Sequence, residues 1–189
     1  LFLGSGASRE AFHQNGIKSP TGQELSDLIA KKFLGDTYIN NDLNYVSELA
    51  ISESSLYNVQ KYIYDIFSEF KAGEAHMSIP LFSWHSIFTT NYDLLIEDAY
   101  SNIKDKNQTI VKFIKNGQKV NDAMREKNSL MYFKLHGCIS EIIDENLPLI
   151  LTINQYIDYQ KNRSNLFERL QSFSADYPVI FVGHSLADA

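Results

Sequence analysis

The sequence predicts an α/β fold, in which helices flank a parallel sheet and a helical insertion follows the first strand–helix unit. Short apolar runs of strand-forming residues alternate with longer stretches whose apolar residues recur at helical spacing. Several of the short runs stop abruptly at small or polar residues. The clearest is Ser86–Thr89, which is followed by Asn91, Tyr92 and Asp93 before a helical pattern begins at Leu94. A strand that turns directly into a helix places such side chains at the carboxyl edge of the sheet, where open α/β sheets bind ligands.

Asn91 and Asp93 also have a second interpretation, because Asn and Asp are frequent caps at the start of a helix. For this tripeptide alone, a helix cap and a ligand site are equally good interpretations. The other motifs of the chain decide between them.

Length and composition indicate a globular protein. The 189 residues suffice for one sizeable core, so we expect a single domain over residues 1–189 with a helical insertion at about residues 36–84. Hydrophobic residues make up 44% of the chain and aromatic residues are plentiful, which favours an ordered core over disorder. The chain begins without Met and ends just after a motif, so we expect it to be a fragment of a larger protein.

Charge, cysteine content and hydropathy disfavour several classes of protein. The formal net charge is -6 and no long run of Lys or Arg occurs, which argues against direct nucleic-acid binding. Cys138 is the only cysteine, so neither a disulfide within the chain nor a four-cysteine zinc site can form, and a cytoplasmic location is favoured. No apolar run approaches the roughly 18 residues of a membrane span, so no membrane association is expected.

The first strand is predicted to end in a turn of small residues. Leu1–Leu3 has the apolar character of a buried strand, and Gly4–Ser8 follows it directly. Such a turn exposes backbone N–H groups that suit phosphate. It lacks the Gly-Lys-Ser/Thr of a Walker A loop, and Arg9 occupies the third glycine position of the GxGxxG pattern. A tight turn between a strand and a helix also needs small residues without any ligand.

A long helical segment separates this turn from the next strand. Residues 11–20 are predicted to form a loop, and Thr21 with Glu24 has the form of a capping box that opens a helix ending at Gly35. Over residues 42–70, two apolar stripes at helical spacing indicate helices that lie over the sheet with a structural role.

One histidine stands at the end of a predicted strand. Leu130–Leu135 is a good strand, and His136 and Gly137 follow it. The glycine permits a tight turn or the close approach of a ligand. Because the sheet would fix its position, His136 is a better candidate for a general base than His76 or His85, which we leave unassigned. A packed core histidine is the alternative interpretation of His136.

Local signals predict the remaining elements of the second half. Thr109–Ile114 is expected to form a short strand, followed by a turn at Asn116-Gly117 and a loop beyond it. Leu149–Leu151 is expected to be a further short strand. The capping box of Thr152–Gln155 opens a helix, and the apolar spacing of residues 167–173 indicates another.

The last strand signal is the strongest in the chain. Pro178–Val182 is continuous and rich in β-branched residues, as buried parallel strands are, and it stops at Gly183–Asp188. With it, four predicted strands end in small or polar residues. A parallel sheet would bring all four ends to one rim, which describes a site better than any one of them does alone.

Four motifs together resemble the sirtuin-like (Sir2-like) domains of bacterial anti-phage defence proteins. They are GSGAS at residues 4–8, TTNYD at 89–93, KLHG at 134–137 and FVGHSLAD at 181–188. Each motif is weak alone, but the set is specific, and its order and spacing match the family over essentially the whole chain. The resemblance implies a Rossmann-like sheet that binds NAD, and it implies cleavage of the nicotinamide N-glycosidic bond.

The resemblance also implies roles for individual residues. The small-residue turn would wrap the pyrophosphate, the Asn–Asp turn would hold the nicotinamide ribose, the histidine would be the base, and the last segment would lie against the adenosine half. The catalytic candidates are therefore Asn91 and His136, and the NAD-binding candidates are Gly4, Ser5, Gly6, Ala7, Ser8, Thr90, Asn91, Asp93, Gly183, Ser185 and Asp188. The chemistry agrees, because loss of nicotinamide leaves an oxocarbenium-like sugar and a neutral imidazole can activate water.

The chain departs from the family pattern in two ways. Ser5 stands where Ala is common in the first turn. Deacylating sirtuins usually carry a four-cysteine zinc module, whereas this chain has Cys138 alone, so no zinc is expected and NAD hydrolysis is favoured over protein deacylation.

The leading hypothesis is an NADase that yields nicotinamide and ADP-ribose and depletes NAD in an abortive anti-phage response. ADP-ribosyl transfer or cyclisation stays open, as does a non-catalytic nucleotide-sensing module that regulates a neighbouring domain, although binding alone does not need the base His136. As partners, the resemblance implies NAD, other copies of the protein joined through regions outside this chain, and a phage-derived trigger or a partner defence protein.

Overall fold

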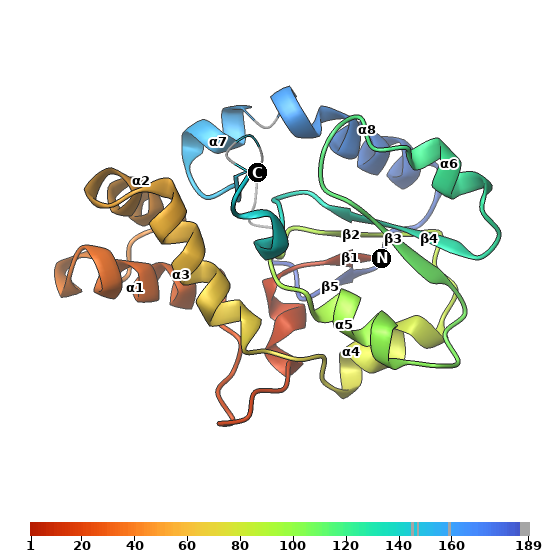
Figure 1. Cartoon of the computed structure of the whole chain (residues 1–189), viewed down its shortest axis with the longest axis horizontal. Helices are drawn as coiled ribbons and strands as arrows, with labels where there is room; N and C mark the ends of the chain where they lie inside the picture. Colours follow the sequence, from red (N-terminus) through yellow and green to blue (C-terminus); the bar gives the residue numbers. More distant parts are fainter. Residues whose placement is uncertain (145, 147, 159, 186–189) are drawn as a thin grey trace.

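A five-stranded sheet forms the centre of the computed structural model, which describes residues 1–144, 146, 148–158 and 160–185. Every neighbouring pair of strands is parallel, and the order across the sheet is β3-β4-β2-β1-β5 (Figure 1). The predicted α/β fold with a parallel sheet is therefore confirmed. The strands are β1 (Phe2–Leu3), β2 (Ser86–Thr89), β3 (Thr109–Phe113), β4 (Ser129–Lys134) and β5 (Phe181–Val182).

The register of the sheet aligns the carboxyl ends of four strands. Leu3 of β1 pairs with Thr89 of β2 and with Val182 of β5, and Thr89 pairs in turn with Lys134 of β4. Each of these residues is the last of its strand. The chain therefore leaves the sheet at the same level four times, and the four predicted strand ends do share one edge.

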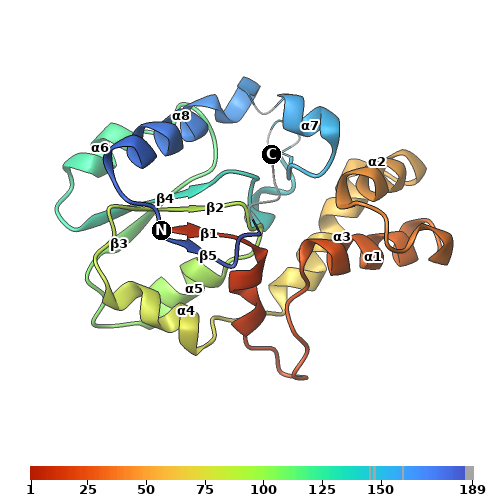
Figure 2. The same cartoon turned by 180° about the vertical axis from the view of Figure 1, so that it is seen from behind.

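The helices form three groups (Figure 1). One group, α4 with α5, covers one face of the sheet, and a second, α6 with α8, covers the other. The third group, α1 to α3, lies beyond the carboxyl edge, as the view from behind also shows (Figure 2). Their bounds are α1 (Gly22–Phe33), α2 (Leu43–Glu53), α3 (Leu56–Ser68), α4 (Glu74–Ser78), α5 (Leu95–Asn102), α6 (Val120–Arg125), α7 (Ile153–Asp158) and α8 (Gln160–Asp176). The 3₁₀ turns are η1 (Ser5–Glu10), η2 (Asp36–Tyr38), η3 (Ile79–Leu81) and η4 (Ile139–Glu141).

Both faces of the central strands β1, β2 and β4 are buried, which explains their nearly continuous apolar sequence. Phe88 and Phe133 stack at a centroid distance of 4.6 Å on the face that α6 and α8 cover. Their strand neighbours Ile87 and Tyr132 point the other way and join the cluster under α5. This alternation follows from the two-residue repeat of a strand.

The helices of the third group pack against the loops that leave the sheet rather than against the sheet itself. Their apolar side chains form one cluster with Tyr92 after β2, Ile139 after β4, and the buried segment Leu149–Leu151. The helices predicted over residues 42–70 were expected to lie over the sheet, which is wrong. They are α2 and α3, and they lie beyond the carboxyl edge because their apolar side chains pack on the loops that leave the strands (Figure 1). The start of α1 is the predicted capping box, in which Thr21 and Glu24 each bond the other's backbone N–H. The capping box at Thr152 and Gln155 is present too.

Leu149–Leu151 is not a strand, contrary to the sequence prediction. Its residues are almost fully buried, but side chains satisfy the backbone that a neighbouring strand would otherwise pair. Leu149 N donates to Gln60 Oε1 at 2.7 Å, Leu151 N donates to Gln155 Oε1 at 2.8 Å, and Ile150 N donates to the His136 carbonyl at 2.9 Å. The segment is apolar because it is buried, and not because it pairs with a neighbouring strand.

Two further predictions need correction. The predicted strand Pro178–Val182 shrinks to two residues, and Phe181 and Val182 are 49% and 43% exposed instead of buried, because β5 is an edge strand that pairs with β1 alone in the described part of the chain. The predicted loop after Asn116-Gly117 contains the short helix α6. Its buried Ala123 packs in the cluster of Phe133, a contact that the polar local sequence does not reveal.

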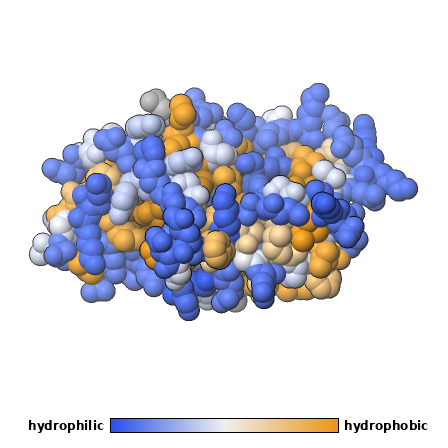
Figure 3. Space-filling model, turned by 60° about the horizontal axis from the view of Figure 1, so that its bottom comes forward, coloured by the Kyte–Doolittle hydropathy of each residue, from blue (hydrophilic) through white to orange (hydrophobic). Residues whose placement is uncertain are grey.

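The surface is mixed in character. On the face shown in Figure 3, hydrophilic residues predominate and hydrophobic patches lie between them. Among the residues that the structure describes, none of the helices combines the length and the apolar character that crossing a bilayer requires.

Gln60 provides a test of how the loop before α7 is held. Its amide joins α3 to that loop, accepting from Leu149 N and donating to the Ile142 carbonyl at 3.2 Å, and its side chain is buried. Gln60→Leu leaves both backbone groups buried without a partner, so we expect the free energy of unfolding to fall by about 1–3 kcal/mol in urea denaturation. The matched control is Gln171→Leu, at an exposed position of α8. Equal stability of the two variants would contradict this account of the loop.

Candidate functional site

A pocket of about 580 Å³ opens at the carboxyl edge of the sheet. All four aligned strand ends contribute to it, and α1 to α3 supply the opposite wall through Leu25, Leu43 and Phe67. This volume lies in the range of ordinary small-molecule sites. The lining residues are Ser5, Gly6, Ser8, Pro20, Thr21, Gly22, Gln23, Leu25, Leu43, Phe67, Thr90, Asn91, Tyr92, Asp93, His136, Tyr156, Gly183, His184 and Ser185.

The structure brings most of the predicted site residues together. Of the candidates, Ser5, Gly6, Ser8, Thr90, Asn91, Asp93, His136, Gly183 and Ser185 line this one pocket. Gly4 and Ala7 belong to the same turn but do not line it. Asp188 lies outside the described residues.

The turn after β1 is held against the turn after β5. A Cβ on Gly4 would lie 2.6 Å from the Gly183 carbonyl oxygen, and one on Gly6 would lie 2.8 Å from it, so both positions require glycine. Gly183 itself has φ +65° and abuts the backbone of Ala7. The small residues of the GSGAS motif thus have a packing role that is independent of any ligand.

This packing also uses backbone donors that the sequence analysis assigned to phosphate. The amide of Gly4 donates to the Val182 carbonyl at 3.0 Å, that of Gly6 to the Gly183 carbonyl at 2.8 Å, and that of Ala7 to the Gly4 carbonyl at 2.9 Å. These three N–H groups are therefore committed within the protein in this structure. A pyrophosphate at the turn would be met by its remaining polar groups, including the hydroxyl of Ser5.

Asn91 is fixed to the turn after β1 by its side-chain amide. Its Nδ2 donates to the Gly4 carbonyl at 2.9 Å and to Ser8 Oγ at 3.0 Å. Its backbone N–H donates to Thr89 Oγ1 at 3.0 Å, and that hydroxyl donates to the Leu3 carbonyl at 2.9 Å. The ends of β1 and β2 are therefore joined through side chains, and Asn91 has one defined orientation in the pocket.

Asp93 belongs to the same network and also caps the next helix. Ser8 Oγ donates to Asp93 Oδ2 at 2.7 Å, while the Leu95 amide at the start of α5 donates to Asp93 Oδ1 at 3.1 Å. Asp93 thus accepts from the first amide of α5, as the cap interpretation expects, and it also lines the pocket. Asp93 is 4% exposed, so its carboxylate places a negative charge in the pocket wall that has little contact with water.

His136 lies at the end of β4, where the Leu135 amide still donates to the Thr89 carbonyl at 2.8 Å. The imidazole is 7% exposed and meets the ring of Tyr156 edge-on at a centroid distance of 5.2 Å. Burial, together with the positive charges of Arg163 and His184, lowers the pKa of His136 to about 3. The imidazole is therefore neutral throughout the physiological range and can accept a proton or a hydrogen bond.

Arg163 is a buried cation behind the His136 turn. Its Nε donates to the Ile114 carbonyl at 3.3 Å and its Nη2 to the Pro148 carbonyl at 2.7 Å. Gly137 has φ +95°, and a Cβ there would lie 3.1 Å from Arg163 Nη2. The glycine after the histidine is thus required by its own backbone conformation and by this neighbour. Burial lowers the pKa of Arg163 to about 10, which leaves it charged at neutral pH.

The two unassigned histidines lie away from the pocket lining. His76 is buried and its Nδ1 accepts from the Gly73 amide at 3.2 Å, and His85 stacks on Tyr177 at 4.0 Å near the amino end of β2. Among the described residues, no three His, Cys, Asp or Glu side chains gather as a metal site would need.

Sequence reasoning missed several residues of the pocket. Phe67, Tyr156 and His184 all line it, but none was singled out. Tyr156 directly follows a capping box and His184 stands inside the last motif, so their places in the sequence could have marked these two as site residues. Phe67 carried no local signal, because its stripe on α3 looks like any core-facing helix.

The neutral state of His136 predicts a specific dependence of stability on pH. The pKa is about 3 in the native protein and near 6.5 in the unfolded chain, so below pH 6.5 the unfolded state binds more protons. The contribution of His136 to stability is complete above pH 6.5 and is lost as the pH falls towards 3. Between pH 7 and 5 we expect the wild-type free energy of unfolding to fall about 2 kcal/mol further than that of His136→Gln. Parallel urea titrations of the two proteins measure this, and equal slopes would contradict the assignment.

Comparison with known proteins gives the family of the chain. A family model described as the SIR2-like domain matches residues 85–189, more than half of the chain. The match includes Asn91, Asp93 and His136, whereas the turn after β1 precedes it. No curated protein matched the chain. SIR2-like domains are NAD-dependent enzymes, and the chain belongs to this family of SIR2-like domains.

Proposed function

We propose that this protein is an NAD glycohydrolase, which cleaves NAD to nicotinamide and ADP-ribose. The observation that carries the proposal is the meeting of Asn91, Asp93 and a neutral His136 in one pocket at the carboxyl edge of a SIR2-like sheet. The pocket is walled by both apolar and polar groups, as sites for nucleotides with rings and phosphates are.

The charges of the pocket suit the bond that would break. NAD carries a positive charge on its nicotinamide ring, and the sugar becomes cationic as that ring departs. The buried carboxylate of Asp93 would stabilise positive charge at this end of the pocket, because electrostatic interactions strengthen where water is excluded. Asn91, which does not ionise, would orient the ribose and the attacking water.

The hydrolytic step balances with these residues alone. The bond between the ribose C1′ and the nicotinamide nitrogen breaks, and its electron pair neutralises the ring, which leaves as nicotinamide. A water oxygen bonds to C1′, and its proton passes to the neutral imidazole of His136. A pKa of about 3 makes this imidazole a weak base, so little push would come from it and positioning would supply much of the rate.

Hydrolysis is preferred here over protein deacylation. Cys138 is the single cysteine of the sequence and lies 1% exposed behind the rim, so these residues cannot build the four-cysteine module of deacylating sirtuins. ADP-ribosyl transfer or cyclisation would use the same pocket with another acceptor, and product analysis separates them from hydrolysis. A nucleotide-sensing module would bind NAD without turnover.

The biological setting that we propose rests on the resemblance of the motifs. In this setting, the protein depletes the cytoplasmic NAD pool during an anti-phage response and acts as an assembly of several copies. A phage-derived trigger or a partner defence protein activates it. Nucleic acid and membrane have no direct part in this scheme.

The direct test measures NAD consumption and products with the purified full-length protein, its trigger or partner present. Asn91→Ala is expected to lower turnover by about 10²–10³-fold, because Asn91 would orient the ribose. His136→Ala is expected to lower turnover by about 10²-fold, the low end for a general base, because its imidazole is a weak base. His85→Ala, at the opposite end of β2, is the matched control and should keep near wild-type turnover. Free nicotinamide and ADP-ribose in equal amounts identify hydrolysis. NAD binding without turnover in the activated wild type would overturn the proposal in favour of a sensor.

A further inference from the structure

Lys134 is a lysine with no exposed side-chain surface, and the proposed chemistry does not use it. Lysine is almost never fully buried unless it is paired, so such a residue needs an explanation. It is the last residue of β4, two positions before His136, and it opens the KLHG motif.

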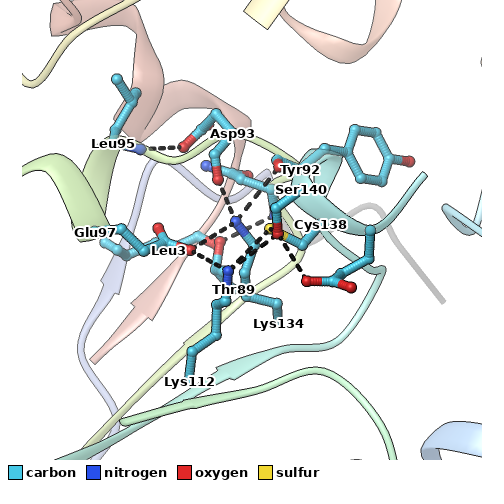
Figure 4. Close-up of polar contacts among 12 residues, drawn as sticks. Leu3, Thr89, Tyr92, Asp93, Leu95, Glu97, Lys112, Lys134, Cys138 and Ser140 are labelled. Carbon is cyan, nitrogen blue, oxygen red and sulfur yellow. Dashed lines mark hydrogen bonds and ion pairs between the residues drawn. The ribbon is translucent and has the colours of Figure 1, made fainter. Parts of the chain in front are cut away.

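The ammonium of Lys134 reaches across to the turn after β2. Its Nζ donates to the Asp93 carbonyl in a short hydrogen bond and to the Tyr92 carbonyl at 3.4 Å (Figure 4). On its other side it forms an ion pair with Glu97 Oε1 of α5 at 3.7 Å. One side chain from the strand of His136 therefore binds the backbone on which Asn91 and Asp93 are carried.

The ammonium is charged in this environment. Burial acts to lower the pKa of Lys134, but the carboxylates of Glu97 and Asp93 and the contact with Cys138 outweigh it, and the pKa is raised overall. A charged ammonium offers three donors and no acceptor. Two donors meet the Tyr92 and Asp93 carbonyls, and the Glu97 carboxylate balances the charge at 3.7 Å. Hydrogen bonds from a charged donor are roughly twice as strong as neutral ones, so Lys134 holds the backbone of the turn more strongly than a neutral side chain would.

We propose that Lys134 is a positioning residue, which fixes the Asn91–Asp93 turn relative to His136 so that both sides of the pocket meet the same substrate. The inference rests on the proposed function of the pocket for its kinetic consequence, although the geometry of the turn can be tested without turnover. Beyond β2 the turn has left the ladder of the sheet. Its backbone is then held by Thr89 Oγ1 and by the Ile139 amide, which donates to the Tyr92 carbonyl at 3.0 Å, with Lys134 as the charged contact.

Lys112 of β3 provides a matched comparison. It pairs with the same carboxylate, its Nζ lying 3.4 Å from Glu97 Oε1, and it contacts Cys138 Sγ at 3.6 Å and Ser140 Oγ at 3.2 Å (Figure 4). Within the described part of the chain, Lys112 thus contacts the same cluster but donates to no carbonyl of the Asn91–Asp93 turn. If the cluster served stability alone, the two lysines would be equivalent.

The test compares two single variants of equal charge, Lys134→Met and Lys112→Met. Each leaves Glu97 paired with the other lysine, at 3.4 Å or 3.7 Å, so neither leaves this carboxylate without an ion-pair partner. With NAD as substrate, we expect the Lys134 variant to lose about 10²-fold in kcat, with KM little changed, because misplacement of about 1 Å has that effect. The Lys112 variant is expected to keep a kcat at least about tenfold higher than this.

A second readout decides the geometry independently of catalysis. The side-chain amide of Asn91 is bonded to Gly4 and Ser8 in the native turn, so its hydrogens should exchange slowly in ¹⁵N-detected NMR. We expect faster exchange in the Lys134 variant than in the Lys112 variant. Equal exchange in both variants, or equal kcat, would overturn the role of Lys134. If the wild type turns over no NAD, the proposed function fails, and the exchange measurement alone decides whether Lys134 positions the turn.

Discussion

The parallel pairing of β1, β2, β4 and β5 in one register is the constraint on which the site depends. Because Leu3, Thr89, Lys134 and Val182 stand side by side across the sheet, the next residues of all four strands leave at one edge. No single strand end contains a site. Segments more than 80 residues apart in the chain become neighbours through this register, and the hydroxyl of Ser8 then bonds both Asn91 and Asp93.

The pocket combines groups that fold stability alone would not favour. A nearly buried carboxylate, Asp93, and a neutral imidazole, His136, line the pocket, and the buried guanidinium of Arg163 lies behind the turn that follows His136. Each loses contact with water, and each is compensated by hydrogen bonds or kept in its neutral form. Perturbed groups of this kind gather at functional sites, where the fold supports them for their chemistry. The apolar helices α1 to α3 make this possible, because they close the carboxyl edge from the other side.

Local signals predicted what is local in this protein. Strand runs that stop at small or polar residues located the carboxyl edge, and the capping boxes at Thr21 and Thr152 located two helix starts. The segment Leu149–Leu151 was predicted wrongly because its partners, Gln60 and Gln155, are side chains and not a strand. From its apolar residues alone, a buried segment held by side chains cannot be distinguished from a buried strand.

Long-range contacts account for the rest of what sequence reasoning could not supply. The backbone amides of the GSGAS turn were predicted to be free to bind phosphate, yet three of them donate to carbonyls of the protein. Two of these carbonyls belong to Val182 and Gly183, whose position beside the turn the local sequence does not give. Phe67 and Lys134 acquire their places from contacts with distant segments. Both residues have ordinary local sequence patterns, and only the tertiary fold makes them part of the pocket or of its support.

The central claim is that the four strand ends form one NAD site, oriented with the nicotinamide ribose at Asn91 and His136. The most direct measurement is a crystal structure with a carbocyclic NAD analogue, whose nicotinamide bond cannot be hydrolysed. The account predicts the analogue in the pocket at the carboxyl edge, with its nicotinamide side against Asn91, Asp93 and His136 and its diphosphate beside Ser5. An analogue bound in the reverse orientation, or outside this pocket, would contradict it.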